Sequence, residues 1–337
     1  MIMPAASGNS GPGRPAGWLV LTASERGAAH VAVKTPNQDS VAVERAGASG
    51  VVTAVADGHG HSRHLRSGKG SRYAVTIGCQ VGQEFADKLT ADRLDEPAIA
   101  TAETEARAER IVDLATGFLV PTVVDRWREA VLADVEADPF TEAEQGKRRR
   151  GDDPTIAYGS TLLLCVAVGN WLVLAQIGDG DVVGVCADGT ATLPVPADPQ
   201  LDGLVTTSLC GPHAISDFRV AIVNTTRTPL LAALLATDGY GNAQVVEEWP
   251  DSFSKDLAWL LRERDMRWLA SQLPAWAARC ASANGSADDT TVALLISPAG
   301  QTAHEITVPG GTAGTTASEP DPGTDEITIP ADIRTTR

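Results

Sequence analysis

Aspartates stand at the starts or ends of several expected strands, and three of them are followed by glycine. The apolar, β-branched run of residues 51–56 predicts a buried strand, and it stops at Asp57-Gly58-His59. A carboxylate at the end of a rigid strand, beside a glycine that exposes its backbone, is well placed to hold a metal ion. Taken alone, the stretch also fits an ordinary Asp-Gly turn. The other acids must decide between these interpretations.

Those acids recur at the same kind of place in the chain. They are Asp39, Asp179, Asp238 and Asp288, the last of which is followed by Asp289. Several carboxylates crowded together would repel one another and would not all ionise without a cation. Oxygen ligands favour Mg²⁺ or Mn²⁺ over zinc. A pair of such cations binds phosphate oxygens and lowers the pKa of a bridging water, which indicates metal-assisted hydrolysis.

The bulk composition limits the classes of protein that fit. The chain has 337 residues, of which 43% are hydrophobic, so it can bury a sizeable core. Its formal net charge of −16 argues against general nucleic-acid binding, which needs a basic surface, and the acidic surface also serves solubility. We therefore expect no nucleic-acid partner.

The cysteines and the chain start bear on the compartment. Five cysteines are scattered with no C-x-x-C pair, which is typical of free thiols in a reducing environment. The Gly/Pro/Ser-rich start lacks an apolar signal region, and no uninterrupted apolar run reaches membrane-spanning length. We expect a soluble, cytoplasmic protein without a membrane partner.

Expected strands occur in groups that are interrupted by helical regions. The strands are expected at residues 18–24, 30–34, 41–43, 51–56, 159–168, 171–177, 182–186, 230–237 and 290–296. The sequence pattern predicts helices within residues 62–89, 106–137 and 251–283. Hairpins such as the one that turns at Gly169-Asn170 favour an α+β fold, within reach of a two-sheet sandwich covered by helices.

The chain is expected to form one folded domain with two low-complexity ends. Residues 1–16 and the Gly/Thr/Pro-rich, acidic tail 298–337 predict disorder, and the catalytic domain is expected over 17–297. Inside it, residues 187–219 carry several prolines and predict a long irregular connection. Such connections are uncommon unless they act as a functional flap.

The order of the motifs resembles that in the metal-dependent (type 2C) serine/threonine protein phosphatases. Their amino-acid sequences are more similar to the bacterial branch of the family than to the animal one. The motifs are Asn37-Gln38-Asp39, Val55-Ala56-Asp57-Gly58-His59-Gly60, Gly159-Ser160-Thr161 with Ile177-Gly178-Asp179, Ala236-Thr237-Asp238-Gly239 and Asp288-Asp289-Thr290-Thr291-Val292. The resemblance covers about residues 18–297. It implies two packed, mainly antiparallel β-sheets flanked by pairs of helices on both sides.

The resemblance also implies roles for the acids around two Mg²⁺ or Mn²⁺ ions. Asp57 would bridge both ions, and the Gly58 carbonyl would bind one of them. The other implied metal residues are Asp238 and Asp288 as direct ligands, Asp39 through metal-bound water, and Asp179 at a third, looser ion found in many members. A metal-bridging water or hydroxide would attack phosphorus directly, with no phosphoenzyme.

Two further residues carry implied roles toward the substrate. His59 aligns with a histidine that protonates the leaving alkoxide in the animal branch, a task that suits an imidazole. Lys34 stands where many members have a phosphate-binding arginine, and a plain solvated lysine is an equally good interpretation of it. Gln38 and Gly180 replace the usual Glu and Ser, and neither change removes a direct metal ligand.

The resulting hypothesis is a Mg²⁺/Mn²⁺-dependent phosphatase for phosphoserine and phosphothreonine in proteins. The implied partners are phosphorylated proteins and a cognate kinase. A pseudophosphatase that binds phosphoproteins without turnover is the alternative, and another metal-dependent hydrolase, for instance of nucleotides, is a third candidate. The sequence indicates neither the individual substrate nor the oligomeric state.

Overall fold

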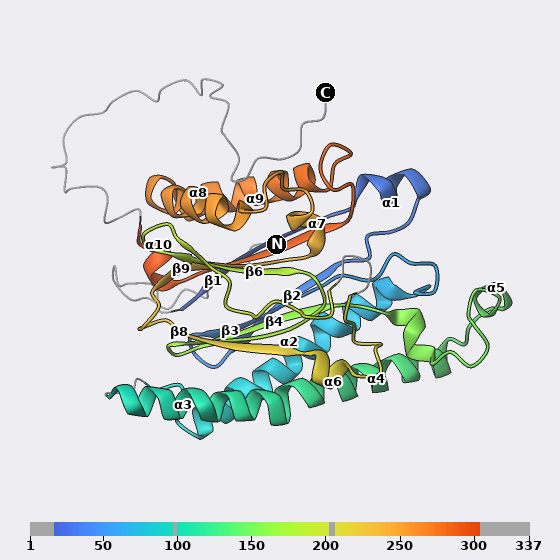
Figure 1. Cartoon of the computed structure of the whole chain (residues 1–337), viewed down its shortest axis with the longest axis horizontal. Helices are drawn as coiled ribbons and strands as arrows, with labels where there is room; N and C mark the ends of the chain where they lie inside the picture. Colours follow the sequence, from blue (N-terminus) through green and yellow to red (C-terminus); the bar gives the residue numbers. More distant parts are fainter. Residues whose placement is uncertain (1–16, 97–99, 202–205, 304–337) are drawn as a thin grey trace.

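The structure, a computed structural model, describes residues 17–96, 100–201 and 206–303. Over these residues it contains two five-stranded sheets that face each other, with helices on both outer sides (Figure 1). Every pairing of strands within the sheets is antiparallel. The predicted α+β sandwich is confirmed.

The first sheet has the strand order β1-β10-β9-β6-β7. Its strands are β1 Leu19–Glu25, β10 Thr290–Ile296, β9 Leu230–Ala236, β6 Asp181–Cys186 and β7 Ala191–Thr192. The central strands β9 and β10 are buried along their whole length. A strand covered on both faces needs apolar side chains on both, and this is why these strands read as continuous apolar runs.

The second sheet has the strand order β2-β3-β4-β5-β8. Its strands are β2 Ser40–Ala46, β3 Gly50–Ala56, β4 Leu162–Val168, β5 Trp171–Ile177 and β8 Arg219–Asn224. The expected hairpin of β4 and β5 is present, with Gly169 at φ +54° in its turn. Side chains such as Val55, Leu163, Leu235 and Leu295 fill the space between the two sheets.

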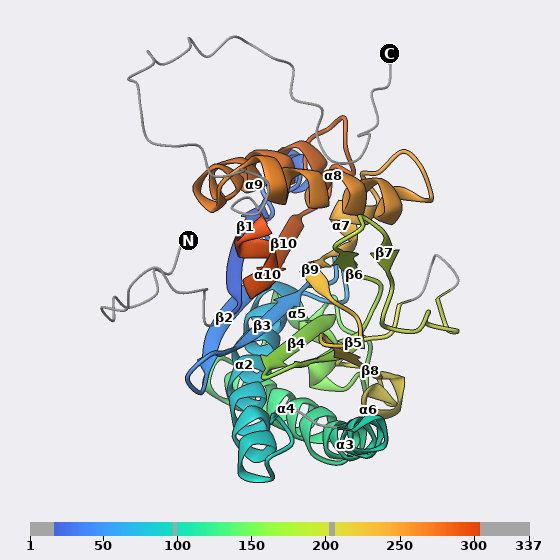
Figure 2. The same cartoon turned by 90° about the vertical axis from the view of Figure 1, so that its left-hand side faces the viewer.

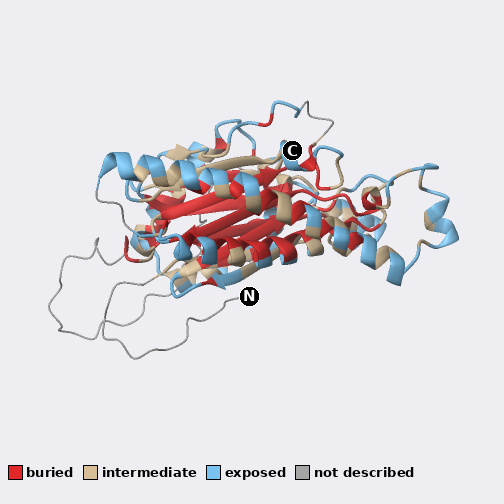
Figure 3. Ribbon diagram, turned by 90° about the horizontal axis from the view of Figure 1, so that it is seen from below, coloured by how far each residue is buried: buried red, intermediate tan, exposed pale blue. Residues whose placement is uncertain are grey.

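Long helices cover the two outer faces, as Figures 1 and 2 show from two directions. On the second sheet lie α2 Ser67–Ala91, α3 Thr101–Leu114, the π-helical turn η1 Ala115–Leu119, and α4 Val120–Ala137. On the first sheet lie α8 Trp249–Glu263 and α9 Met266–Cys280. Burial follows these layers, since the strands and the inner faces of the helices are shielded from solvent (Figure 3).

Short helical elements occupy the connections. They are α1 Ala28–Val33, α5 Glu142–Gln145, the 3₁₀ helix η2 Pro154–Tyr158, α6 Ala214–Asp217, α7 Asp238–Gly241 and α10 Pro298–Gln301. None of the helices in the described part of the chain is long and apolar enough to cross a membrane.

The antiparallel registers bring strand ends from distant parts of the chain to one edge of the sandwich. Ser40 at the start of β2 pairs with Ala56 at the end of β3. In the other sheet, Val292 near the start of β10 pairs with Ala236 at the end of β9. Acids that precede one strand and acids that follow its neighbour therefore meet at the same edge.

Several local expectations differ from the structure. Residues 30–34 were expected to be extended, but α1 is a helix that ends at Lys34 in the left-handed conformation, with φ +62°. The helical text of 251–283 is two helices, because Asp265 caps a new one by accepting a hydrogen bond from the Trp268 N–H. Strand β8 had no counterpart among the expected strands.

Part of the expected C-terminal tail is folded. Residues 298–301, assigned to the expected disordered tail, form α10, and the backbone N–H of Ser297 just before it donates to Leu231 O. Residues 1–16 and 304–337, the remainder of the expected disorder, lie outside the described residues.

Candidate metal centre and substrate cleft

The sequence-predicted acids converge at one edge of the sandwich. The carboxylates of Asp57, Asp179 and Asp238 each offer an oxygen within 4.8 Å of the other two. Asp57 follows β3 and Asp179 follows β5 in one sheet, whereas Asp238 follows β9 in the other. The group therefore spans both sheets and depends on how they pack.

Backbone pairing fixes the position of Asp57. Its N–H donates to Thr161 Oγ1 at 3.0 Å, and its carbonyl accepts from the Thr161 N–H at 2.9 Å. The next residue, Gly58, pairs with Ser160 as an isolated antiparallel bridge. A Cβ on Gly58 would lie 2.7 Å from both Gln38 O and Ser67 O, so only glycine fits there. The Gly-Ser-Thr motif thus holds the Asp-Gly motif.

Mutual repulsion of the acids is visible in their pKa values. Burial, followed by the charges of Asp39 and Asp238, raises the pKa of Asp57 well above its usual range. Burial and the charge of Asp179 raise the pKa of Asp238 to about 7. Burial also raises the pKa of Asp179. Carboxylates in such a group ionise together only when a cation neutralises them.

Asp39 lies at the back of the same group. Its Oδ2 accepts a hydrogen bond from Thr237 Oγ1 at 2.8 Å, while its Oδ1 is buried and has no hydrogen-bond partner. Burial raises the pKa of Asp39 to about 7. A buried carboxylate oxygen without a donor is costly unless a ligand or water satisfies it. Asp39 lies near Asp57, because its charge contributes to the raised pKa of that residue.

The two acids of the closing motif have different roles. Asp288 lines the cleft together with Asp57 and Asp238. Asp289 is 3% exposed and accepts hydrogen bonds from the backbone N–H groups of Gly27 and Gln38, at 2.7 and 2.6 Å. Asp289 therefore positions the segment that carries Asp39, and Asp288 faces the site.

The acids open onto a cleft of about 770 Å³. One part of its wall consists of His59, His61, Arg63 and His64, and the expected flap contributes residues 206–208 and 210–213. Asp57, Asp238 and Asp288 line the cleft between them. The cleft therefore combines a possible cation site with a wall of hydrogen-bond donors.

His59 lies in this wall and contacts the flap. Its Nε2 lies 2.8 Å from Ser208 Oγ. Because Ser208 Oγ donates to Ser160 O at 3.1 Å, we assign the Nε2 atom as the protonated nitrogen that donates to Ser208. Burial lowers the pKa of His59 to about 4, so the ring is neutral at neutral pH.

His64 packs edge-on against His59, with ring centroids 4.9 Å apart. Its Nδ1 lies 2.5 Å from the carbonyl oxygen of Ile156, to which it donates, and burial lowers its pKa. Both imidazoles press on Gly159, where a Cβ would lie 2.3 Å from His64 Nδ1. The glycine of the Gly-Ser-Thr motif therefore leaves room for these two rings.

The donor set fits a hard divalent cation. All of the converging side-chain atoms are carboxylate oxygens, which suit Mg²⁺ or Mn²⁺ and do not suit a softer metal. The unpartnered Asp39 Oδ1 and the raised pKa values of its neighbours both fit a site that binds a divalent cation.

The comparisons with known proteins agree with this geometry. The family model described as Protein phosphatase 2C matches residues 26–276. The chain belongs to the protein phosphatase 2C family. No curated protein matches the sequence.

Solved structures show how widely the fold of this family is shared. A crystal structure of a bacterial serine phosphatase has a TM-score of 0.52 at 14% identity, covering 82% of this chain and 96% of that one. Serine/threonine phosphatase Stp1 from Staphylococcus aureus gives 0.52 at 13% identity, covering 82% and 94%. PstP/Ppp from Mycobacterium tuberculosis gives 0.46 at 20% identity, covering 83% and 98%. At these identities the first two likenesses show the fold alone.

In this protein phosphatase 2C family member, two residues near the acids were not singled out from the sequence. Asp181 follows Asp179 closely in Gly178-Asp179-Gly180-Asp181, and burial and the charge of Asp179 raise its pKa to about 7. Arg63 lines the cleft, although it belongs to none of the motifs. Proximity in sequence to Asp57 was the only signal that could have indicated it.

Lys34 is the predicted site residue that the structure does not place beside the others. It is exposed, caps the C-terminal end of α1, and is not among the residues that line the cleft. Its proposed contact with a phosphate stays a prediction.

Proposed function

We propose that this protein hydrolyses phosphoserine and phosphothreonine in proteins with the help of two Mg²⁺ or Mn²⁺ ions. The observation that carries the proposal is the convergence of Asp57, Asp179 and Asp238, with oxygens within 4.8 Å of one another, beside an open cleft that Asp57 and Asp238 line. Membership of the protein phosphatase 2C family supports the same reaction class.

The acids would share the cations as the family pattern implies. Asp57 would bridge both ions with the Gly58 carbonyl beside it, Asp238 and Asp288 would be further direct ligands, Asp39 would act through water, and Asp179 would hold a third ion. Bound cations would supply charge for the phosphate oxygens and acidify a water molecule at neutral pH.

His59 would serve the leaving group. Its Nε2 proton is directed to Ser208 in the flap wall of the cleft, so a substrate oxygen that displaces Ser208 would receive that hydrogen bond. To donate a proton to the alkoxide, His59 would act as an imidazolium, a form that the negative charge of a bound phosphate beside it would favour.

We also propose a kinase counterpart and a cellular location for this reaction. Phosphoprotein substrates require a serine/threonine kinase, which we propose as the functional counterpart of this chain. The five cysteines are free thiols, which supports a cytoplasmic, reducing location.

The test is Mn²⁺-dependent release of phosphate from a phosphothreonine peptide. We expect turnover by the wild type, loss by a factor of about 100 or more in Asp57→Ala and Asp238→Ala, and wild-type rates in Asp113→Ala, which removes an exposed acid on α3. A wild type that binds the peptide and Mn²⁺ without turnover would instead establish a pseudophosphatase. Full activity in both site variants would refute the metal assignment.

A further inference from the structure

Arg63 is the one arginine or lysine among the described residues that line the cleft. It lies in the turn that follows Asp57-Gly58-His59, on the wall beside the acids. The position where a phosphate-binding cation was expected from the sequence, Lys34, is exposed and outside that lining. Arg63 therefore supplies the permanent positive charge in a cleft that is also lined by carboxylates.

Among the described residues, the guanidinium of Arg63 forms hydrogen bonds through one terminal nitrogen only, so its other N–H donors are without an acceptor. Its Nη2 donates to Asp152 Oδ1 and Oδ2, at 3.2 and 3.3 Å. Its Nε is shielded from solvent and has no hydrogen-bond partner. The side chain as a whole remains 31% exposed. Guanidinium groups carry five N–H donors in a planar fork, so one carboxylate on Nη2 leaves part of the fork without an acceptor.

The partner carboxylate is itself fixed. Asp152 Oδ2 also accepts from the backbone N–H of Arg149 at 3.2 Å, and its carbonyl accepts from Arg148 Nη2 at 2.8 Å. Only 14% of its side chain is exposed. Because Asp152 is fixed by these other contacts, it determines the position of the Arg63 guanidinium.

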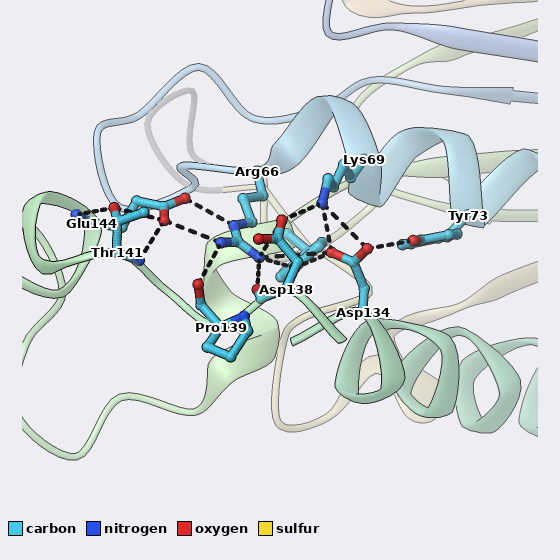
Figure 4. Close-up of polar contacts among 9 residues, drawn as sticks. Arg66, Lys69, Tyr73, Asp134, Asp138, Pro139, Thr141 and Glu144 are labelled. Carbon is cyan, nitrogen blue, oxygen red and sulfur yellow. Dashed lines mark hydrogen bonds and ion pairs between the residues drawn. The ribbon is translucent and has the colours of Figure 1, made fainter. Parts of the chain in front are cut away.

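The turn that carries Arg63 is clamped at both ends. At one end, Asp57 exchanges hydrogen bonds with Thr161. At the other end, Arg66 donates to both oxygens of Glu144, at 2.8 and 3.0 Å, and to the Asp138 carbonyl at 2.7 Å (Figure 4). The distance from the guanidinium to the acids is therefore set by packing, as a preorganised binding group requires.

We propose that Arg63 binds the phosphate group of the substrate, through the terminal guanidinium N–H donors that Asp152 leaves without an acceptor, opposite the cations held by the acids. The planar fork of arginine matches two phosphate oxygens, which a lysine meets only as a point charge. This inference rests on the proposed phosphatase function and names the phosphate-binding residue of its site.

Three variants test the assignment: Arg63→Ala, Arg63→Lys and Lys34→Ala. The measurements are KM and kcat for a phosphothreonine peptide and for an aryl phosphate, and the Ki of inorganic phosphate, all with saturating Mn²⁺. Arg63→Ala should raise KM for both substrates and the Ki of phosphate by about 10- to 100-fold, the usual effect of a charge-assisted hydrogen bond. Arg63→Lys should lie between the wild type and Arg63→Ala, and Lys34→Ala should stay within about twofold of the wild type.

Arg126→Ala is the matched control. Arg126 also pairs with a carboxylate, donating to both oxygens of Glu84 at 2.6 and 2.9 Å, but it is not among the cleft-lining residues. It should leave KM, kcat and the Ki of phosphate unchanged. Thermal unfolding and Mn²⁺ titration of every variant separate a binding loss from a folding defect, and Arg63→Lys provides the comparison if Arg63→Ala does not fold.

Other results would overturn the assignment. A Ki of phosphate that is unchanged in the Arg63 variants, or a KM effect seen with the peptide and not with the aryl phosphate, would place Arg63 at a flanking residue of the substrate. A larger effect of Lys34→Ala than of Arg63→Ala would transfer the role to Lys34.

The proposed function can fail separately from this inference. If the wild type shows no turnover, Mn²⁺-dependent binding of inorganic phosphate, measured by calorimetry, still tests Arg63. Loss of that binding in Arg63→Ala would keep the phosphate-site assignment while the enzyme proposal falls. Turnover in the wild type, with KM and the Ki of phosphate unchanged in the Arg63 variants, would keep the enzyme proposal and refute the phosphate-site assignment.

Discussion

Replacing Arg66 by alanine should destabilise the protein more than the removal of any exposed ion pair. Arg66 precedes α2, and its side chain is 7% exposed. Its guanidinium donates to both oxygens of Glu144, to the Asp138 carbonyl and, at 2.9 Å, to Tyr158 Oη (Figure 4). It also lies over the ring of Phe140, 4.6 Å from the centroid.

The size of the effect follows from burial. Removal of one partner from a buried ion pair costs about 3–5 kcal/mol, because the other charge loses its compensation. The Glu144 side chain is 24% exposed, so water replaces part of what it loses. We therefore expect a loss of about 2–3 kcal/mol in the free energy of unfolding, which is a fall in Tm of about 4–6 °C for a domain of this size.

Urea unfolding of Arg66→Ala beside Arg126→Ala checks the reasoning. Both arginines donate to two oxygens of one glutamate, but the Arg126 and Glu84 side chains are 40% and 44% exposed. An exposed pair contributes about 0–1 kcal/mol, so Arg126→Ala should cost at most that much. Arg66→Lys, which keeps the charge without the fork, should fall between the two. Equal losses from Arg66→Ala and Arg126→Ala would refute the argument from burial.

The pH dependence of the same difference has a definite sign. Hydrogen bonds from Arg66 lower the pKa of Glu144 from 4.5 to about 2. A carboxylate with a depressed folded-state pKa contributes its stability above the unfolded value and loses it as the pH falls through the folded value. The wild type should therefore exceed Arg66→Ala by more at pH 7 than at pH 3. A difference that grows in acid would contradict the assignment of the pair.

Three further outcomes are expected. His59→Ala should reduce the rate most for alkyl phosphates, whose leaving groups need a proton, and a uniform loss on aryl and alkyl substrates would argue against a proton donor. Gly58→Ala places a Cβ 2.7 Å from two backbone oxygens, whereas Gly60→Ala meets nothing within 4 Å, so thermal unfolding should show a loss of stability only for the first, by about 1–3 kcal/mol. Mn²⁺ at one hundred times its Kd should stabilise the wild type by about 2.7 kcal/mol, and an equal rise in Tm for Asp238→Ala would count against Asp238 as a ligand.

Much of the fold could be predicted because its strands are buried on both faces. Strands such as β4, β5 and β9 read as unbroken apolar runs, and their ends are marked by Asp-Gly or Gly-Asn pairs. Strand β8 was missed because all of its residues are only partly buried, so it lacks that signal. The segment 30–34 was misassigned because a six-residue helix is too short to show a 3.6-residue period.

The candidate site could be predicted as a set of acids, but not as an arrangement. Asp288 and Asp289 are adjacent and chemically identical, so their local chemistry does not say which one faces the cleft, and only the family resemblance favoured Asp288. The structure separates them because Asp289 is enclosed by the backbone N–H groups of Gly27 and Gln38, which belong to a segment some 250 residues away. Long-range packing of that kind leaves no local pattern.

The sequence by itself determined which residues can bind cations, since carboxylates at strand ends next to glycines are a local property of the chain. Only the tertiary structure decided which positively charged side chain lies in the same cleft as these carboxylates. Lys34 lies outside the cleft because α1 turns it to solvent, and Arg63 lines the cleft because Asp57 and Arg66 fix both ends of its turn. Both outcomes come from contacts between segments that are distant in sequence, and such contacts exist only once the two sheets have packed.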